Sequence, residues 1–389
     1  MLDLFLAEDL LPESSRILKR SIRDFLEKEI RPGILEAFHT ETPQDMRQLA
    51  PKMGALGMLG AFIPEEDGGP GGSYFDYGVV CQETERLDSS LRSFIAVISA
   101  LVMYPIWRFG SSAQRRRWLP ALAKGEAIGC FGLTEPNAGS DPSSMETRAR
   151  KVQNGWVLKG RKQWISEASI ADFAIVWAKT EMGIRGFLIE KGTEGFETAP
   201  IQKKGSMRAS DVGELIFEDA LVSEEALLPK SSGLKSPLSC LTQARFGIAW
   251  GALGAAEDCL ETALDYTKER KQFGSPIASF QLVQKKLVDM FIGVTQGNLL
   301  VMRLAQLMQE GQASFQAVSL AKKVTVALAR SCASASRELL GANGITLEYP
   351  PIRHMMNIES IYTYEGTDDM HTLILGEALT GIGAFRKEA

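Results

Sequence analysis

The stretch TRARKVQNGWVLKGRKQWIS, residues 147–166, carries the clearest strand pattern in the chain. Its two halves flank Asn154-Gly155, a pair that tolerates the positive φ angles of a type I′ turn. The stretch therefore predicts a β-hairpin. Similar runs follow at 172–180, 184–192 and 213–222, and a second hairpin is expected around 181–183. Together they predict a small antiparallel sheet or barrel between about residues 128 and 228.

Helix-forming sequence lies on both sides of this β region. Residues 13–125 carry apolar side chains at helical spacing, as in SSRILKRSIRDFLEKEI. Four long runs rich in Ala and Leu follow the β region, at 238–271, 277–310, 313–341 and 368–384. This order predicts an α+β fold of three domains. They are an N-terminal all-α domain (1–127), a middle antiparallel β domain (128–236) and a C-terminal four-helix-bundle domain (237–389).

The composition narrows the class of protein. The chain has 389 residues, of which 45% are hydrophobic and 23% charged, and its formal net charge is −5. These are values of a folded globular protein, and the acidic balance disfavours nucleic acid as a partner. Five scattered cysteines without a C-x-x-C pair indicate reduced thiols in a reducing compartment.

The termini and apolar runs suggest where the protein works. The N-terminal residues lack the basic segment of a signal peptide, and no apolar run is expected to approach about 20 residues. We therefore expect a protein of the cytoplasm, or of an organelle matrix after removal of a targeting segment. We expect it neither to be secreted nor to span a membrane.

Several common catalytic motifs are absent from the sequence. It contains no G-x-x-x-x-G-K-[ST], no G-x-G-x-x-G opening a βαβ unit, no H-E-x-x-H and no G-x-S-x-G. The three histidines, His39, His354 and His371, are isolated from one another. A nucleotide site of the P-loop or Rossmann kind, a metal site and a serine hydrolase site therefore lose their usual support.

Four other segments combine residue types suited to binding or catalysis. They are CFGLTEPNAGSD (130–141), RKQWIS (161–166), ERKQFGSP (269–276) followed by Gln281, and YTYEGTDD (362–369). The first exposes amides and hydroxyls to a polar ligand, or is an ordinary connection. Trp164 packs on a cofactor ring or is an interior side chain. Arg270 neutralises a pyrophosphate or belongs to a solvated charge cluster at a helix end. Glu365 is a base if water is excluded from it, or a solvated residue of a capping loop.

In this order and at these distances, the four segments resemble the acyl-CoA dehydrogenase family. The resemblance covers essentially the whole chain and includes the α–β–α order, so it implies the fold of that family. Within the family, the sequence looks most like the glutaryl-CoA dehydrogenase branch. The supporting stretches include ETERLDSSLRS (83–93), LVMYPI (101–106), CFGLTEPNAGSDPSSMETRA (130–149), ARFGIAWG (244–251) and YEGTDDMHTLILGEALTG (364–381).

The resemblance implies FAD as the cofactor, bound without a Rossmann fold. The residues expected to bind it are Phe131, Leu133, Thr134, Ser140, Trp164, Ile165, Ser166, Arg270, Phe273, Gln281, Leu339, Gly341, Thr367 and Asp369. Arg270, Phe273, Gln281 and the turn from Leu339 to Asn343 are expected to reach the FAD of a neighbouring subunit. A homotetramer is therefore expected as well.

By the same resemblance, Glu365 is the catalytic base that removes the α-proton of an acyl-CoA while hydride leaves its β-carbon for the flavin. In the family, the thioester oxygen accepts hydrogen bonds from a ribityl hydroxyl of the flavin and from the backbone N–H of this Glu. The residues expected to contact the substrate are Arg92, Ser93, Ser140, Arg245, Tyr364 and Gly366.

Arg92 bears on the choice of substrate. In glutaryl-CoA dehydrogenases an Arg in this segment pairs with the distal carboxylate of the substrate, and Glu85 is expected to hold Arg92 when the site is empty. The chain departs from the branch at Ala96-Val97-Ile98, where Ser-x-Gln is usual. It departs again at Thr242-Gln243, where a pair of Asn is more common.

Three activities follow from these features. The first is oxidation of glutaryl-CoA with decarboxylation to crotonyl-CoA, as in lysine and tryptophan degradation. The second is the same flavin chemistry on another short acyl-CoA. The third is a flavoprotein that binds acyl-CoA or DNA without catalysis, which the presence of Glu365 and the acidic charge disfavour. An electron-transfer flavoprotein is the implied electron acceptor, and oxygen is the alternative.

Overall fold

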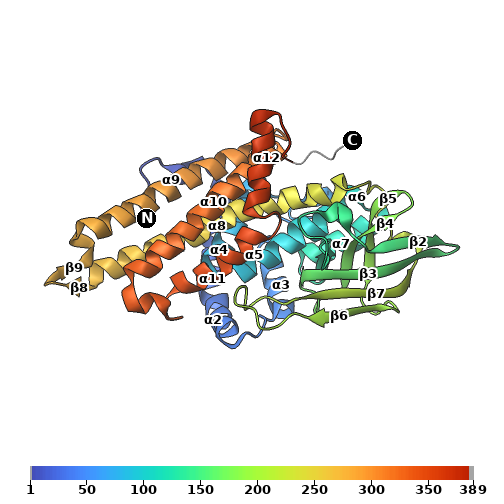
Figure 1. Cartoon of the computed structure of the whole chain (residues 1–389), viewed down its shortest axis with the longest axis horizontal. Coiled ribbons are helices and arrows are strands. Elements are labelled where there is room, and N and C mark those ends of the chain that lie inside the picture. The colour runs from blue at the N-terminus through green and yellow to red at the C-terminus, as the bar shows by residue number, and fades with distance from the viewer. Residues whose placement is uncertain (1, 385–389) are drawn as a thin grey trace.

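A computed structural model describes residues 2–384 as helices, then a sheet, then helices, in an elongated molecule with the sheet at one end (Figure 1). Among the N-terminal helices, α1 and α5 pack against α4, which itself lies against the later helix α8. The bounds of the N-terminal helices are α1 (Glu13–Phe25), α2 (Arg31–Thr40), α3 (Met46–Ala55), α4 (Tyr74–Leu87), α5 (Ser89–Ala96), α6 (Tyr104–Phe109) and α7 (Ser112–Ala123). The sequence-based expectation of helices before the sheet is confirmed.

The chain from α5 to α6 is continuous helix through a π-helical segment, Val97–Met103. This stretch, Ser89–Phe109, has 21 residues and contains an 18-residue window with a mean hydropathy of 1.5, which is wholly buried in the protein. In a second stretch, Gln281–Gln309, the corresponding window has a mean hydropathy of 1.2 and is 39% buried. By length and composition, both could cross a membrane. The expectation that no apolar run approaches that length was therefore wrong. In Ser89–Phe109 the apolar side chains form the core of the helical region.

The β region forms one seven-stranded sheet. Its strands are β1 (Gly129–Gly132), β2 (Arg148–Val152), β3 (Gly155–Ser166), β4 (Phe173–Thr180), β5 (Gly183–Glu190), β6 (Phe196–Pro200) and β7 (Val212–Val222). They follow the order β1-β4-β2-β3-β7-β6, and β5 pairs with β4. Most pairs are antiparallel, as expected, but β1 lies parallel to β4 and β2 meets β4 in parallel at one residue pair. The sheet is therefore mixed. After β1 the chain forms the β2–β3 hairpin, and only then adds β4 beside β1.

Both predicted hairpins are confirmed, and the first turn is shifted by one residue. Val152 pairs with Gly155, so Gln153 and Asn154 form the turn and Gly155 is the first residue of β3. Gly155 has a φ of 152°, and a Cβ there would lie 1.9 Å from the carbonyl oxygen of Val222. A glycine is required at this position because β7 passes so close to the backbone.

The C-terminal region contains one helix more than expected among the described residues. Its helices are α8 (Lys235–Glu269), α9 (Gln281–Gln309), α10 (Phe315–Leu339), α11 (Pro350–Thr363) and α12 (Asp368–Thr380). The segment of α11 lies between two of the helical runs expected from the sequence, 313–341 and 368–384, and no helix was expected there. Pro350 and Pro351 instead occupy the first turn of α11, where a missing backbone N–H costs nothing. The limits between domains at 127/128 and 236/237 stay a prediction.

Candidate active site

Glu365 lies in the short loop that joins α11 to α12. Its backbone has a φ of 54° and that of Gly366 a φ of 94°, so two successive residues adopt the left-handed region. The Oε2 atom of Glu365 is shielded from solvent and, within residues 2–384, has no hydrogen-bond partner. The alternative of a fully solvated carboxylate is therefore wrong, and the arrangement suits an acceptor of a proton.

Two cations from different helices hold the loop around Glu365. Arg245 on α8 donates from Nε to the carbonyl oxygen of Glu365 at 2.7 Å. Lys322 on α10 donates from Nζ to the carbonyl oxygens of Tyr364 at 2.6 Å and Gly366 at 2.7 Å. Sequence reasoning missed Lys322, because nothing in its local sequence distinguishes it from other lysines of a helix.

A third cation, Arg92 on α5, approaches the same loop from the N-terminal region. Its side chain is fully buried and forms an ion pair with Glu85 on α4, as expected from the sequence. It also donates to the hydroxyl of Tyr364. Nη1 of Arg92 and Oε1 of Glu85 are both buried and have no partner in the part of the chain that the structure describes. The guanidinium therefore retains an open donor.

Burial and the nearby positive charges act on the pKa of Glu365 in opposite directions. Burial raises the pKa of Glu365, and the positive charges of Arg92, Lys322 and Arg245 oppose this rise without cancelling it. Burial also lowers the pKa of Lys322 to about 7, against the attraction of Glu365. Burial lowers the pKa of Arg92 too, but Glu85 and Tyr364 outweigh this and keep it above its ordinary value. A raised pKa suits a carboxylate that must take up a proton near neutral pH.

The two segments expected to face the flavin are joined to each other. The backbone N–H of Gln163 donates to the carbonyl oxygen of Thr134 at 2.9 Å. Between Lys162 and Ile165 the pairing of β3 with β7 shifts register, which is a β-bulge. Trp164, inside the bulge, has a φ of 61° and is 59% exposed. The alternative that Trp164 is an interior side chain was therefore wrong.

The outward-facing Trp164 beside Ser166 offers a flat apolar surface with a hydroxyl close by in the chain. Ser166 is half-buried at the end of β3, and Ile165 between them is buried. An aromatic ring with heteroatoms on its edge, such as an isoalloxazine, suits this combination of stacking surface and hydrogen-bond donors. These residues therefore fit a flavin.

A buried ion pair holds the loop between β1 and β2, and sequence reasoning missed this pair. Lys162 donates from Nζ to Oε1 of Glu135 at 2.7 Å and to the carbonyl oxygen of Leu133 at 3.1 Å. Glu135 also accepts from the backbone N–H of Glu146 at 2.5 Å and of Thr147 at 3.0 Å. Burial lowers the pKa of Lys162 to about 8, against the attraction of Glu135. The pair fixes the backbone of residues 133–147 next to Trp164.

The remaining predicted residues vary in exposure. Phe131, Leu133, Ser93 and Leu339 are buried, whereas Ser140, Asp369 and Gly341 are exposed. The hydroxyl of Thr367 caps α12 by accepting from the N–H of Met370 at 3.3 Å. A Cβ on Gly366 would lie 3.0 Å from Nε2 of His371, so side chains pack closely against this residue. Their roles in binding stay predictions.

Arg270, Phe273 and Gln281 are not brought to this site within one chain. They lie at or beside a hairpin of β8 (Lys271–Gln272) and β9 (Ser275–Pro276), between α8 and α9. In Figure 1 this hairpin is at the end of the molecule opposite the sheet. Phe273 is 94% exposed with a φ of 50°. A large apolar side chain presented in this way is suited to contact with another chain.

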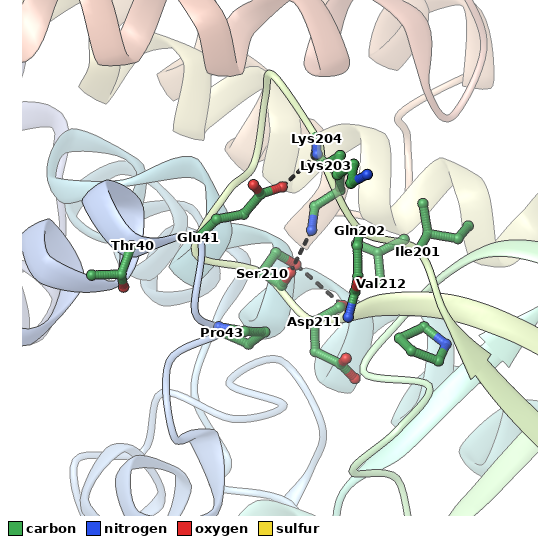
Figure 2. Close-up of a pocket in the computed structure, with 11 residues that line it drawn as sticks. Thr40, Glu41, Pro43, Ile201, Gln202, Lys203, Lys204, Ser210, Asp211 and Val212 are labelled. Atoms are coloured by element: carbon green, nitrogen blue, oxygen red, sulfur yellow. Dashed lines mark hydrogen bonds between the residues drawn. The ribbon is translucent and has the colours of Figure 1, made fainter.

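A separate cavity of about 260 Å³ lies between the end of α2 and residues 200–212. Figure 2 shows Glu41 accepting from the backbone N–H of Lys204, and Nζ of Lys204 donating to the carbonyl oxygen of Ser210. None of the predicted site residues lines this cavity. Within residues 2–384, no group of three or more His, Cys, Asp or Glu side chains is placed to hold a metal ion.

The shielded carboxylate of Glu365 among cations is suited to accept a proton, and the outward-facing ring of Trp164 is suited to stack on a flat cofactor. Three family models match successive parts of the chain. They are the N-terminal domain of acyl-CoA dehydrogenase over residues 12–126, the middle domain over 130–220 and the C-terminal domain over 231–380.

Individual proteins are similar over nearly the full chain. A glutaryl-CoA dehydrogenase from Mycobacterium smegmatis is 46% identical, with a TM-score of 0.95 over 97% of each chain. A structure of a glutaryl-CoA dehydrogenase from the same organism in complex with FADH2 is 44% identical, with a TM-score of 0.96 over 98% of each chain. The human mitochondrial short-chain specific acyl-CoA dehydrogenase is 34% identical over 376 residues, which cover 94% of this chain and 90% of the relative. The chain belongs to the acyl-CoA dehydrogenase family and is an oxidoreductase of that family.

Proposed function

We propose that this enzyme oxidises glutaryl-CoA and releases CO₂ to give crotonyl-CoA. The observation that carries the choice of substrate is the fully buried Arg92 with its open Nη1 donor, next to the loop of Glu365. A buried guanidinium binds a carboxylate strongly, because the pair is charge-assisted and shielded from water. A dicarboxylate-derived acyl chain supplies that carboxylate, whereas a simple fatty acyl chain does not.

Glu365 is the proposed base for the α-proton. Its Oε2 is shielded from water and unpaired among residues 2–384, and its raised pKa matches it to a proton that is only weakly acidic. Burial also excludes water from the reacting carbons. The cofactor is FAD, which supplies the acceptor for the hydride that leaves the β-carbon.

The thioester oxygen needs a donor when the α-proton leaves, because negative charge develops on it. The backbone N–H of Glu365 donates to no other group among the described residues. It is therefore free to serve as that donor. The open Nη1 of Arg92 is proposed to receive the distal carboxylate.

A shared cofactor site is proposed for the assembled enzyme. Phe273 and Arg270 are exposed on the hairpin that is remote from the sheet of their own chain. Apolar residues on the exposed side of α9, including Leu282, Val288 and Ile292, add surface for association. A homotetramer in which the hairpin reaches a neighbour's FAD accounts for the exposed hairpin and for the exposed apolar side of α9. An electron-transfer flavoprotein is the proposed electron acceptor. The proposed location is the cytoplasm or an organelle matrix.

Anaerobic titration of the yellow holoenzyme tests the proposed function. Glutaryl-CoA is expected to bleach the oxidised flavin, and product analysis under turnover is expected to find crotonyl-CoA and CO₂ in equal amounts. Bleaching by butyryl-CoA with no response to glutaryl-CoA would contradict the proposed substrate. Bleaching by glutaryl-CoA without release of CO₂ would contradict only the decarboxylation.

A second candidate is an acyl-CoA dehydrogenase for a short monocarboxylic acyl group. The observation that favours it is the apolar surface next to Arg92 along the same helical stretch. Ala96 and Ile98 are both buried there, in place of the Ser and Gln that are usual in the glutaryl-CoA dehydrogenase branch. The same titration distinguishes the two candidates.

A further inference from the structure

Lys322 is a buried cation whose hydrogen bonds go to backbone oxygens. The residue is 2% exposed on α10. Its Nζ reaches the carbonyl oxygens of Tyr364 and Gly366 at 2.6 and 2.7 Å, and that of Glu365 at 3.5 Å. Among the ion pairs of residues 2–384, none within 4.0 Å involves Lys322. Burying a charge is costly unless its contacts compensate, so these carbonyl contacts need an explanation.

The contact with Tyr364 determines where the next N–H points. A trans peptide is planar, and its C=O and N–H point in opposite directions. Because Lys322 holds the carbonyl oxygen of Tyr364, the N–H of Glu365 is directed away from Lys322. That N–H has no acceptor in the described part of the chain. The carbonyl group of the Tyr364–Glu365 peptide therefore accepts from Lys322, and its N–H has no partner among the described residues.

The loop needs such a restraint because its backbone is strained. Glu365 has a φ of 54°, which residues with a side chain adopt at a cost. Arg245 restrains the following peptide through the carbonyl oxygen of Glu365. Lys322 restrains the peptides on both sides of it, through Tyr364 and Gly366. Without Lys322, the peptide between Tyr364 and Glu365 could rotate.

We propose that Lys322 is a positioning residue for the reaction: it orients and polarises the Tyr364–Glu365 peptide so that the Glu365 N–H donates to the thioester oxygen. The inference rests on the proposed function, because it assumes a thioester beside Glu365. When Lys322 is protonated, its positive charge at the carbonyl end draws electrons along the amide and makes the N–H a stronger donor. The carboxylate of Glu365 is held by the same restraint.

A purely structural role is the alternative, because a cation near the end of α11 also stabilises the free carbonyls of that helix. The two roles differ in what the bound thioester experiences. A positioning role changes the polarisation of the thioester carbonyl, and a structural role changes only the stability of the fold. The experiment must therefore report on that carbonyl in the folded holoenzyme.

The probe is a CoA thioester of an aryl-conjugated enoic acid, whose absorption moves to longer wavelength when its carbonyl oxygen accepts strong hydrogen bonds. It is bound to oxidised wild-type holoenzyme and to Lys322→Met, Lys322→Gln and Lys323→Met. Gln keeps a neutral donor, which gives a second variant if Met impairs folding. Lys323 is the matched control, because it is the next residue on α10 and pairs with Asp368.

We expect the red shift of the bound probe to be largely lost in Lys322→Met, partly lost in Lys322→Gln and kept in Lys323→Met. The kcat for flavin reduction should fall by about 10- to 100-fold in Lys322→Met with little change in KM. This is less than the 10²–10³ typical of deleting an oxyanion donor, because the N–H itself remains.

A full red shift in Lys322→Met would overturn the positioning role, whatever the change in melting temperature. An equal loss of shift in Lys323→Met would overturn it as well. A wild-type enzyme that binds the probe without any shift would contradict both this inference and the proposed function. A wild-type shift combined with no oxidation of glutaryl-CoA would contradict only the proposed substrate.

Discussion

The guanidinium of Arg92 donates a hydrogen bond to the hydroxyl of Tyr364, the residue immediately before Glu365. Arg92 and Tyr364 are 272 positions apart in the chain. Tyr364 in turn gives its carbonyl oxygen to Lys322. The cation proposed to recognise the far end of the substrate and the base proposed to act near its thioester are therefore linked through one side chain. A distal carboxylate bound at Arg92, as proposed, would therefore act on the loop through Tyr364.

Replacing Glu365 by Gln should leave binding of FAD and acyl-CoA intact and abolish most of the chemistry. The amide has nearly the same shape but cannot accept the α-proton. Anaerobic stopped-flow measurement of flavin reduction should give a rate at least ~10² lower than wild type. Glu359→Gln on α11, which alters an exposed pair with Arg330, is the control and should keep its activity. A near-native rate for Glu365→Gln would remove Glu365 from the mechanism.

The pH dependence of kcat/KM should reflect the raised pKa of Glu365. The base works only when it is ionised, so kcat/KM should rise with pH through an apparent pKa clearly above the ordinary 4.5. The contribution of Glu365 to the free energy of unfolding should change with pH in the opposite direction. Because the folded protein holds this proton more tightly than the unfolded chain, the contribution of Glu365 is favourable at low pH. It is lost as pH rises through the raised pKa.

Melting curves of wild type and Glu365→Gln across pH 4 to 8 measure that trend. The stability of Glu365→Gln relative to wild type should increase with pH over the same interval as the activity limb. If the stability of Glu365→Gln relative to wild type instead decreases with pH, the effect of the cations on the pKa of Glu365 outweighs the effect of its burial. The pKa would then lie below its ordinary value.

Replacing Arg92 by Met should affect substrates with and without a distal carboxylate differently. A charge-assisted hydrogen bond contributes ~1.5–3 kcal/mol, and breaking a buried pair costs ~3–5 kcal/mol. The kcat/KM for glutaryl-CoA should therefore fall by roughly 10- to 1000-fold. Turnover of butyryl-CoA should change little, and it is the internal control. Ala96→Ser should improve glutaryl-CoA turnover by restoring a hydroxyl. Equal losses for both substrates in Arg92→Met would make Arg92 a structural residue.

Replacing Lys162 by Met should destabilise the loop beside Trp164. The variant leaves the buried Glu135 without its cation, and such a loss typically costs ~3–5 kcal/mol. Thermal melting and the FAD content of the purified enzyme should both decrease. The double variant Lys162→Met, Glu135→Leu should recover part of the stability, since no uncompensated charge remains. If the double variant is less stable than the single one, Glu135 acts mainly through its bonds to Glu146 and Thr147.

Replacing Phe273 by Asp should weaken the assembly and its hold on FAD. Among residues 2–384 of its own chain this side chain makes one ring contact, to Phe280, so the fold of a single subunit should be little affected. Light scattering should report a smaller particle, and the flavin-to-protein ratio should drop. Met182→Asp, at the exposed tip of the β4–β5 hairpin, is the control. An unchanged mass and flavin ratio in Phe273→Asp would place the hairpin outside any interface.

Features that depend on a few neighbouring residues could be predicted from the sequence. The β2–β3 hairpin follows from the Asn154-Gly155 pair, although the turn lies one residue earlier than expected, at Gln153 and Asn154. The α–β–α order follows from the change of hydrophobic period, and the loop of Glu365 from its local residues. The role of Glu365 was implied only by the resemblance of the four segments to the family. The helix α11 was missed because its two prolines fit either a turn or the first turn of a helix.

The surroundings of Glu365 were decided by tertiary packing. Arg92, Arg245 and Lys322 come from α5, α8 and α10. The family resemblance implied Arg92 and Arg245 as substrate contacts, but nothing in the sequence distinguished Lys322 from other lysines of a helix. The burial of these three cations, and the direction of their side chains toward one loop, arise only when the helices pack together. The same holds for Lys162 and Glu135 beneath the loop before β2. Local backbone preferences are set by adjacent residues and can be read along the chain. The desolvation and Coulomb energies that tune a carboxylate act through space, between residues that the sequence keeps far apart.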